Sequence, residues 1–284
     1  MIAPAIVARL GLKRVGSQWR GDCPACGYAG SFVMSLGSER TPLWWCASCR
    51  DKEALTAALT GDGYAIAPAP CDRVPVPSSG QRAARAQALW ERGLPITGTV
   101  AETYLRSRAL GAVASDALRF LPAERHKEAA HVGPVLLAAA CDEAGTVRAV
   151  HRTWLREDGT GKAKVDPPRK TLGSPTGCAV RLLLASAKVV LAEGLETALA
   201  AAALFGLPAW SCLTAGGLEA VQLPAPIRSV LVAADNDVSG TGQRAADALA
   251  QRLLAEGRAV RVAIPDRPGE DFNDILRRRI ARHG

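Results

Sequence analysis

Two short apolar runs in the last third of the chain, each followed by acidic residues, constrain the fold most strongly. Residues 189–192 read Val-Val-Leu-Ala and are followed by Glu193. Residues 230–234 read Val-Leu-Val-Ala-Ala and are followed by Asp235 and Asp237. Uninterrupted apolar runs of this length are typical of strands buried in a parallel sheet. Because the active crevice of an open α/β sheet lies outside the carboxyl ends of its strands, we expect the three carboxylates to share one sheet edge.

Carboxylates gathered at one edge repel one another unless a cation lies between them. Their hard oxygen atoms suit Mg²⁺ or Mn²⁺, and Mg²⁺ usually keeps several waters and binds substrate phosphates. A later acidic residue, Asp271, either joins this cluster or caps the last helix. The sequence therefore predicts a catalytic magnesium or manganese site formed by Glu193, Asp235 and Asp237, with Asp271 as a further candidate ligand.

Strand and helix patterns alternate around the two runs, which predicts an α/β layered domain over residues 185–284. A basic α+β region, residues 81–184, precedes it and contains two helices and a hairpin. The expected helices span residues 81–92, 98–108, 196–205, 217–221 and 240–256, and the expected strands span residues 135–141, 147–155, 207–212 and 259–264.

Two C-x-x-C pairs near the N-terminus form the clearest metal-binding pattern. Cys23 and Cys26 are separated by nineteen residues from Cys46 and Cys49. Each pair can form a turn that presents two thiolates, and two such turns close a tetrahedral Zn²⁺ site. A redox C-x-x-C is disfavoured, because there are two pairs and no βαβ pattern surrounds them. We therefore expect a structural zinc ribbon within residues 1–60.

Two tryptophans, Trp44 and Trp45, directly precede the second cysteine pair. In a ribbon with so small a core they either pack over the metal or stack on single-stranded bases. The following residues, 61–80, are rich in Gly, Pro and Ser, which predicts a semi-rigid extended linker. This linker separates the ribbon from the rest of the chain.

Cationic residues gather in the region before the α/β domain. A loop containing Gly161-Lys162 resembles a P-loop only superficially, because Arg156 and Ala163 stand where that motif needs Gly and Ser or Thr. The loop still suits a triphosphate or a nucleic-acid backbone, with a solvated turn as the alternative. The candidate nucleotide- and DNA-binding residues are Arg148, Arg152, Lys162, Lys164, Arg169 and Lys170.

The composition narrows the class of partner. The chain has 284 residues and a net charge of +8, which fits a polyanionic partner such as nucleic acid and, equally, a generally basic solvated surface. No apolar stretch is long enough to cross a membrane. We expect a cytoplasmic protein with no membrane partner.

In combination, these motifs resemble the bacterial-type (DnaG-like) Toprim primases, especially those of phages, plasmids and other mobile genetic elements. That family carries a Glu-Gly after one strand, matched by Glu193-Gly194, and an Asp-x-Asp-x-x-Gly after a later strand, matched by residues 235–240. It also carries an N-terminal zinc ribbon, and the segment 151–173 is similar to its region just before Toprim. One departure stands out: the family motif Glu-Gly-x-x-Asp has Thr197 at its last position here. Glu196 cannot be assumed to replace that aspartate.

The resemblance implies a Rossmann-like Toprim fold and a DNA-directed RNA primase activity. Glu193, Asp235 and Asp237 would be catalytic and would hold Mg²⁺ or Mn²⁺, while Zn²⁺ would be structural. The implied partners are a single-stranded DNA template and ribonucleoside triphosphates. No segment resembling a helicase follows residue 280, so we expect the protein to work with a separate replicative helicase or without one.

Two other functions fit the same motifs. A Toprim-type nuclease uses similar carboxylates to cleave DNA, and a non-catalytic protein could bind single-stranded nucleic acid through its zinc ribbon. The complete set of carboxylates argues against the non-catalytic alternative. The nuclease stays open at this point.

Overall fold

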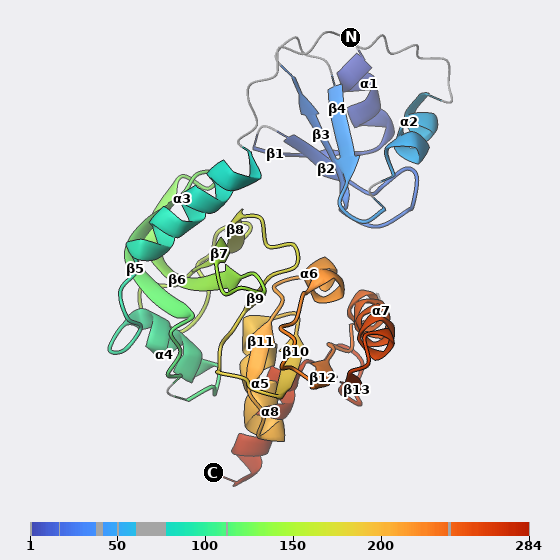
Figure 1. Ribbon diagram of the computed structural model, residues 1–284. Helices are drawn as coiled ribbons and strands as arrows, with labels where there is room; N and C mark the ends of the chain where they lie inside the picture. Colours follow the sequence, from blue (N-terminus) through green and yellow to red (C-terminus); the bar gives the residue numbers. More distant parts are fainter. Residues whose placement is uncertain are drawn as a thin grey trace. The chain divides into compact units, whose positions relative to one another are not determined.

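The computed structural model describes residues 2–16, 18–37, 42–49, 51–60, 78–111, 113–237 and 240–283 (Figure 1). The chain forms two compact units, Met1–Val76 and Pro77–Gly284. Most of the predicted linker, residues 61–77, lies outside the described residues. Residues 78–80 of that predicted linker belong to helix α3 (Ser79–Glu91) and its cap, because the Ser78 hydroxyl accepts a hydrogen bond from the backbone N–H of Gln81.

The N-terminal unit contains a four-stranded antiparallel sheet in the order β1-β2-β3-β4 and two short helices (Figure 1). Phe32 and Met34 of the third strand are fully buried and form a core with Ile6 and Leu55 from the two helices. Its elements are α1 (Ile2–Arg9), β1 (Lys13–Val15), β2 (Gln18–Gly21), β3 (Phe32–Leu36), β4 (Pro42–Cys46) and α2 (Lys52–Thr60).

The C-terminal unit is built on one nine-stranded mixed sheet. Its order is β13-β12-β10-β11-β9-β6-β7-β8, with β5 paired to β6. The strands β10 to β13 are parallel to one another, and the remaining pairs are antiparallel. The strands are β5 (Leu118–His126), β6 (His131–Cys141), β7 (Val147–Trp154), β8 (Arg169–Gly173), β9 (Ala179–Val180), β10 (Lys188–Ala192), β11 (Ala209–Ser211), β12 (Ser229–Ala233) and β13 (Ala259–Ala263).

The sheet joins the two regions that the sequence separates at residue 184. Strand β9 pairs with β6 through Ala140 and Val180, and with β11 through Val180 and Ser211. This two-residue strand therefore links the antiparallel half to the parallel half. Strand β5 was not expected from the sequence, because it contains Pro122 and its pairing is broken by a bulge between Leu121 and Glu124.

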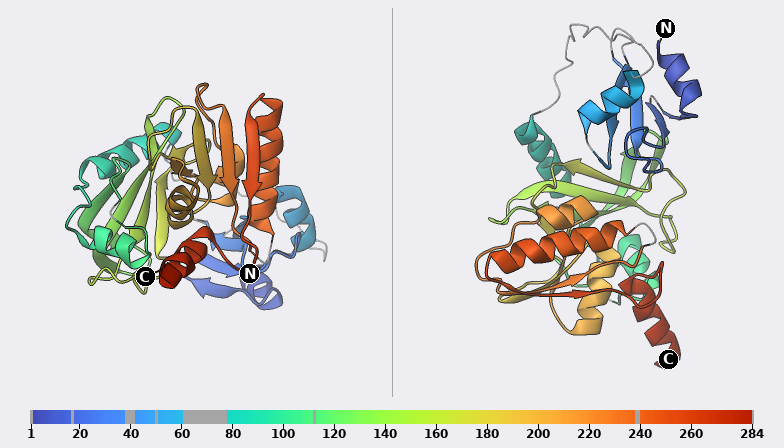
Figure 2. Two further views of the ribbon diagram at one scale, coloured as in Figure 1. Left: turned by 90° about the horizontal axis from the view of Figure 1, so that it is seen from below. Right: turned by 90° about the vertical axis from the view of Figure 1, so that its right-hand side faces the viewer.

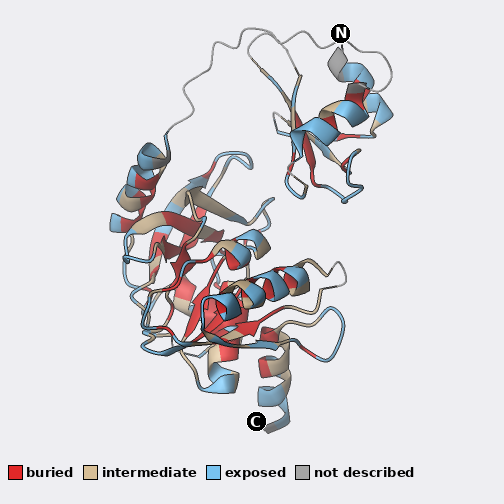
Figure 3. Ribbon diagram, turned by 45° about the vertical axis from the view of Figure 1, so that its right-hand side comes forward, coloured by how far each residue is buried: buried red, intermediate tan, exposed pale blue. Residues whose placement is uncertain are grey.

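Helices cover both faces of this sheet, as the side chains of its strands show by alternation. Val190 and Ala192 of β10 pack with α4 (Val100–Ser107), α5 (Leu195–Phe205) and α8 (Phe272–His283). Val189 and Leu191 pack with α6 (Ala215–Ala220) and α7 (Thr241–Ala255) on the opposite face. Helix α3 covers β6 and β7 on the other side of the sheet from α4. Figure 2 shows helices on both sides of this sheet, and Figure 3 shows that buried residues concentrate in its strands.

The predicted α/β fold with a preceding α+β region and an N-terminal cysteine ribbon is thus confirmed. Among the described residues, every helix is too short or too polar to span a lipid bilayer.

Candidate active site and cysteine cluster

The acidic edge of the parallel sheet forms where two neighbouring strands end. Strands β10 and β12 run in parallel with Ala192 opposite Ala233, so Glu193 and Asp235 follow them on the same edge. The turn after β10 is held by Ser211, whose hydroxyl donates a 2.8 Å hydrogen bond to the backbone carbonyl of Glu193. The hydroxyl of Thr197 donates a hydrogen bond of 3.2 Å to Oδ1 of Asp235.

These carboxylates line a cavity of about 510 Å³ that also contains several cations. A cavity with both charges can hold a cation against the carboxylates and phosphate groups against the basic side chains. Its lining residues are Arg108, His151, Lys162, Arg169, Lys170, Thr171, Glu193, Gly194, Glu196, Thr197, Leu213, Thr214, Asp235 and Asp271.

Burial and mutual repulsion disfavour the charged forms of the acidic residues. Burial, followed by the nearby charges of Asp235 and Asp237, raises the pKa of Glu193. Burial and the charge of Asp271 raise the pKa of Asp235 to about 6. Burial also raises the pKa of Asp271. A bound cation would relieve this repulsion, so the donor set fits a divalent metal.

Among the described residues, the four cysteines of the ribbon form the one group of three or more His, Cys, Asp or Glu side chains that could hold a metal ion by themselves. The acidic cavity instead offers hard carboxylate oxygen atoms. Such a donor set fits Mg²⁺ or Mn²⁺, which would keep waters and take further oxygen ligands from a substrate.

Asp237 is turned toward helix α7 and is not among the residues that line the cavity. Its Oδ2 accepts a 2.9 Å hydrogen bond from the backbone N–H of Gly242, and its Oδ1 accepts one of 3.3 Å from that of Thr241. Its side chain thus caps the helix in this structure. Its charge still reaches the cluster, since it contributes to the raised pKa of Glu193.

Asp271 both caps the last helix and lies at the acidic cavity, the two alternatives that the sequence left open. Its Oδ1 accepts a 2.8 Å hydrogen bond from the backbone N–H of Asp274, and the Asp274 carboxylate accepts one from the N–H of Asp271. This reciprocal pair caps α8. The same Asp271 side chain lines the acidic cavity.

Three of the six predicted basic residues, Lys162, Arg169 and Lys170, line the cavity. The other three lie elsewhere. Arg148 is 3.9 Å from Asp142, and Arg152 lies between the ring of Trp154 and the carboxylate of Glu124. Lys164 is exposed and does not contribute to the cavity lining.

The structure adds site residues that the sequence did not single out. Arg108 follows α4 and enters the cavity lining, where its backbone carbonyl accepts a 2.7 Å hydrogen bond from the side chain of Asn273. His151 of β7 lies next to Thr171, with Nδ1 and Oγ1 3.0 Å apart. Burial and the charge of Arg169 lower the pKa of His151 to about 4. His151 is therefore a neutral hydrogen-bonding group at neutral pH.

The cysteine cluster lies in the N-terminal unit. The Sγ atoms of Cys23 and Cys49 are 4.0 Å apart, and those of Cys26 and Cys46 are 3.8 Å apart. Four thiolates at about 2.3 Å from a central Zn²⁺ would have similar separations, so the cluster fits a tetrahedral zinc site. Although burial opposes it, hydrogen bonds from the Ser31 hydroxyl and from backbone N–H groups lower the pKa of Cys46 to about 6. At neutral pH the charged thiolate form of Cys46 is therefore favoured over its neutral thiol form.

The two tryptophans of β4 point to opposite faces of the ribbon sheet. Trp44 packs against the ribbon core, while Trp45 is 52% exposed. The strand register places Trp45 opposite Val33, Val33 opposite Arg20, and Arg20 opposite Lys13. Trp45, Arg20 and Lys13 therefore share the exposed face. Of the two predicted stacking residues, Trp45 is therefore the more exposed, and Trp44 is half-buried.

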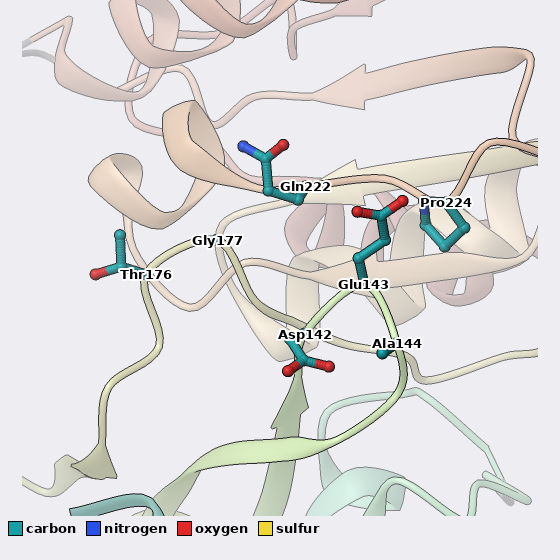
Figure 4. A pocket seen from close by; sticks show the side chains of 7 residues that line it. All are labelled: Asp142, Glu143, Ala144, Thr176, Gly177, Gln222 and Pro224. Atoms are coloured by element: carbon teal, nitrogen blue, oxygen red, sulfur yellow. The ribbon is translucent and has the colours of Figure 1, made fainter. Parts of the chain in front are cut away.

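A second hollow in the C-terminal unit, of about 570 Å³, shares no residue with the acidic cavity (Figure 4). It lies beside the β6–β7 hairpin, where Asp142 and Glu143 form the turn. Its lining includes two carboxylate residues and one amide residue, but none of its lining residues is cationic. The lining residues are Asp142, Glu143, Ala144, Thr176, Gly177, Gln222 and Pro224.

Together, the fold and the site define an α/β protein whose acidic sheet edge faces a partly cationic cavity, with a four-cysteine ribbon in a second unit. Residues 188–281 match the family model described as "Toprim domain", and residues 80–182 match "Domain of unknown function (DUF7146)". The chain therefore contains a Toprim domain, as its acidic motifs had indicated. No curated protein sequence matches the chain.

Several solved structures are similar to the chain. A DNA primase domain from Pseudomonas aeruginosa is 16% identical with a TM-score of 0.46, over 69% of this chain and 74% of that one. The Aquifex aeolicus primase, with zinc-binding and RNA polymerase domains, is 15% identical with a TM-score of 0.45, over 99% and 81%. The primase fragment of the bacteriophage T7 primase-helicase is 18% identical with a TM-score of 0.41, over 93% and 95%.

Proposed function

We propose that this chain is a DNA primase that synthesises short RNA primers on single-stranded DNA by metal-dependent nucleotidyl transfer. The observation that carries the proposal is the single cavity in which the Toprim residues Glu193 and Asp235 meet Arg108, Lys162 and Arg169. Nucleotidyl transfer needs both groups, because a metal must be held beside the reacting phosphate and the negative charge of a triphosphate must be balanced.

In the proposed reaction, the 3′-hydroxyl oxygen of one nucleotide attacks the α-phosphorus of an incoming ribonucleoside triphosphate. A new P–O bond forms, the bond between the α-phosphorus and the oxygen that bridges to the β-phosphorus breaks, the hydroxyl proton passes to water, and pyrophosphate leaves. Glu193 and Asp235, with Asp271 nearby, would hold Mg²⁺ or Mn²⁺, which when bound lowers the pKa of the attacking hydroxyl and offsets charge on the phosphate. Asp237 would act through its charge on this cluster and through its cap on α7.

The basic side chains of the cavity would bind the triphosphate. Arg169 is exposed, and it forms no ion pair with any residue in the described part of the chain. Lys170 forms an ion pair with the carboxylate of Glu128, so its ammonium is less available to a phosphate group than the guanidinium of Arg169. Arg108 approaches from the end of α4, and its charge acts on Asp271. We assign Arg169 and Arg108 to the phosphates of the incoming nucleotide, because planar guanidinium groups match phosphate geometry.

The N-terminal unit would bind the single-stranded template. Trp45 offers an exposed ring for base stacking, and Arg20 and Lys13 on the same face offer positive charge for the backbone. In this proposal residues 1–60 are a template-binding zinc ribbon, 61–77 a linker, and 78–184 and 185–284 two parts of the polymerase unit. A separate replicative helicase would be a partner of this unit.

The test is incubation of the full chain with single-stranded DNA of mixed sequence, four ribonucleoside triphosphates and Mg²⁺. A primase yields short, template-dependent oligoribonucleotides. Shortened DNA without ribonucleotide incorporation would instead indicate a nuclease. Intact DNA that is bound but not copied, with and without an added replicative helicase, would indicate a binding protein.

A further inference from the structure

Glu196 is a buried carboxylate with two partners from distant parts of the chain. It is 9% exposed and occupies the second residue of α5, three residues after Glu193. Its Oε1 lies 2.8 Å from Nζ of Lys162, and the same oxygen accepts a hydrogen bond from the Tyr104 hydroxyl. An unpaired carboxylate would be costly at this depth, so these two contacts determine its state.

The acidic residues of the cavity differ in the protonation state that their surroundings favour. Burial raises the pKa of both Glu193 and Asp235. Burial also opposes ionisation of Glu196, but the ammonium of Lys162 and the hydroxyl of Tyr104 lower its pKa to about 2. Glu196 thus has its own counter-ion within the protein, whereas Glu193 and Asp235 form no ion pair with any described residue, although the charge of Arg169 acts on Glu193. It is therefore a poor candidate to replace the aspartate that the Toprim motif carries at the position of Thr197.

Lys162 is held from both sides of its loop. Its backbone pairs with that of Leu155 in a β-bridge, and between them the loop turns at Gly159. A Cβ at Gly159 would lie 2.8 Å from Cβ of Thr103 and 2.9 Å from the carbonyl oxygen of Val100, so the loop packs directly on α4. The same helix supplies Tyr104, which is buried. Helix α4, the loop and α5 therefore meet at the Lys162 ammonium.

The Lys162 side chain is still 30% exposed and lines the cavity beside Glu193. An ammonium group has three N–H donors, and Glu196 accepts from one of them. The others remain available to oxygen atoms of a ligand in the cavity.

We propose that Glu196 and Tyr104 are positioning residues that fix the Lys162 ammonium in the cavity, where it binds the triphosphate group of the incoming ribonucleotide. This inference rests on the proposed function, because it assigns the substrate of the same cavity. Lys162 touches the substrate, and the other two residues act through it.

The test is a double-mutant cycle with Glu196→Gln, Lys162→Met and the pair of substitutions together. ATP and AMP binding to the full chain are measured by calorimetry with Mg²⁺, and KM and kcat for ribonucleotide incorporation are measured separately. Each single variant should weaken ATP binding and raise KM about tenfold, since a charge-assisted contact is lost or misplaced. The double variant should bind ATP no more weakly than Lys162→Met, and AMP binding should not change.

Two further variants distinguish positioning from folding. Tyr104→Phe keeps the buried ring and removes the hydroxyl that donates to Glu196. In the otherwise unmutated chain, this substitution should weaken ATP binding about threefold. In a chain that already carries Lys162→Met, it should not weaken ATP binding further. Glu102→Gln, on the same helix as Tyr104 and absent from the cavity lining, is the matched control and should bind ATP normally.

Independent, multiplying effects of Glu196→Gln and Lys162→Met on ATP binding would overturn the inference. So would equal losses for ATP and AMP, or an unmutated chain that binds no ATP. Primer synthesis with an unchanged KM in Glu196→Gln would overturn the inference and leave the primase proposal intact. The predicted ATP pattern without any primer would support the positioning role and overturn the primase proposal.

Discussion

The hydroxyl of Thr197 donates a 3.2 Å hydrogen bond to Oδ1 of Asp235, and it links the first turn of α5 to the end of β12. Thr197 is buried and stands where the Toprim motif of primases carries an aspartate. A neutral donor at this position lowers the pKa of Asp235, whereas burial raises it. Thr197 therefore helps to keep Asp235 ionised and oriented.

Removal of the Thr197 hydroxyl should impair catalysis without unfolding the protein. Thr197→Val keeps the branched shape and should lower the rate of primer synthesis about tenfold, because Asp235 loses a hydrogen bond that favours its charged form. Thr197→Ser keeps the hydroxyl and should lose much less. Incorporation of a labelled ribonucleotide measures the rate. An equal loss in both variants would show that the methyl group, not the hydroxyl, matters.

The cysteine cluster should bind one zinc ion per chain and stabilise the N-terminal unit. Cys46→Ala should lose the metal and unfold residues 1–60, because so small a core depends on its metal. Elemental analysis and limited proteolysis measure the two effects. Cys141→Ala is the control, since Cys141 lies in the sheet of the other unit. Full zinc content in Cys46→Ala would contradict the four-cysteine site.

The two tryptophans of β4 should give opposite results on substitution. Trp45→Ala should weaken binding of single-stranded DNA by about tenfold at unchanged stability, because an exposed ring available for stacking is lost. Trp44→Ala should instead destabilise the N-terminal unit by about 3 kcal/mol, because its ring packs on the ribbon core. Fluorescence anisotropy and thermal unfolding measure these effects. Normal DNA binding by Trp45→Ala would remove the exposed face from the template site.

Glu196 should contribute a pH-dependent stability. Its pKa is about 2 in the folded chain and 4.5 as the ordinary value, so the folded state binds this proton less tightly than the unfolded state. Its contribution is therefore fully present above about pH 4.5 and is lost as the pH falls toward 2. The unmutated protein should exceed Glu196→Gln in free energy of unfolding by about 3 kcal/mol near neutral pH. Denaturant unfolding at several pH values measures the difference, and a pH-independent difference would contradict the ion pair.

The sequence allowed prediction of those features that depend on local pattern. The apolar runs located β10 and β12, and their parallel pairing brings Glu193 and Asp235 to one edge. The spacing of the cysteines was enough to predict their cluster, because two C-x-x-C turns and one metal geometry leave few alternatives.

Other features depend on tertiary contacts that no local pattern encodes. Arg108 enters the cavity because Asn273, far along the chain, binds its carbonyl group. The side-chain direction of Asp237 depends on the backbone N–H groups of Thr241 and Gly242 at the start of α7, which donate hydrogen bonds to its carboxylate. Alternation in β4 predicts that Trp44 and Trp45 face opposite ways, but only the packing of the ribbon core decides which of them is exposed.

The most direct test of the proposed chemistry compares primer synthesis by the unmutated chain with that by Asp235→Asn. Asp247→Asn, an exposed substitution on α7, is the matched control. We predict that Asp235→Asn lowers ribonucleotide incorporation on single-stranded DNA at least 100-fold, while Asp247→Asn has full activity. Incorporation by Asp235→Asn at the unmutated rate would contradict the assignment of the acidic cavity as the site of nucleotidyl transfer.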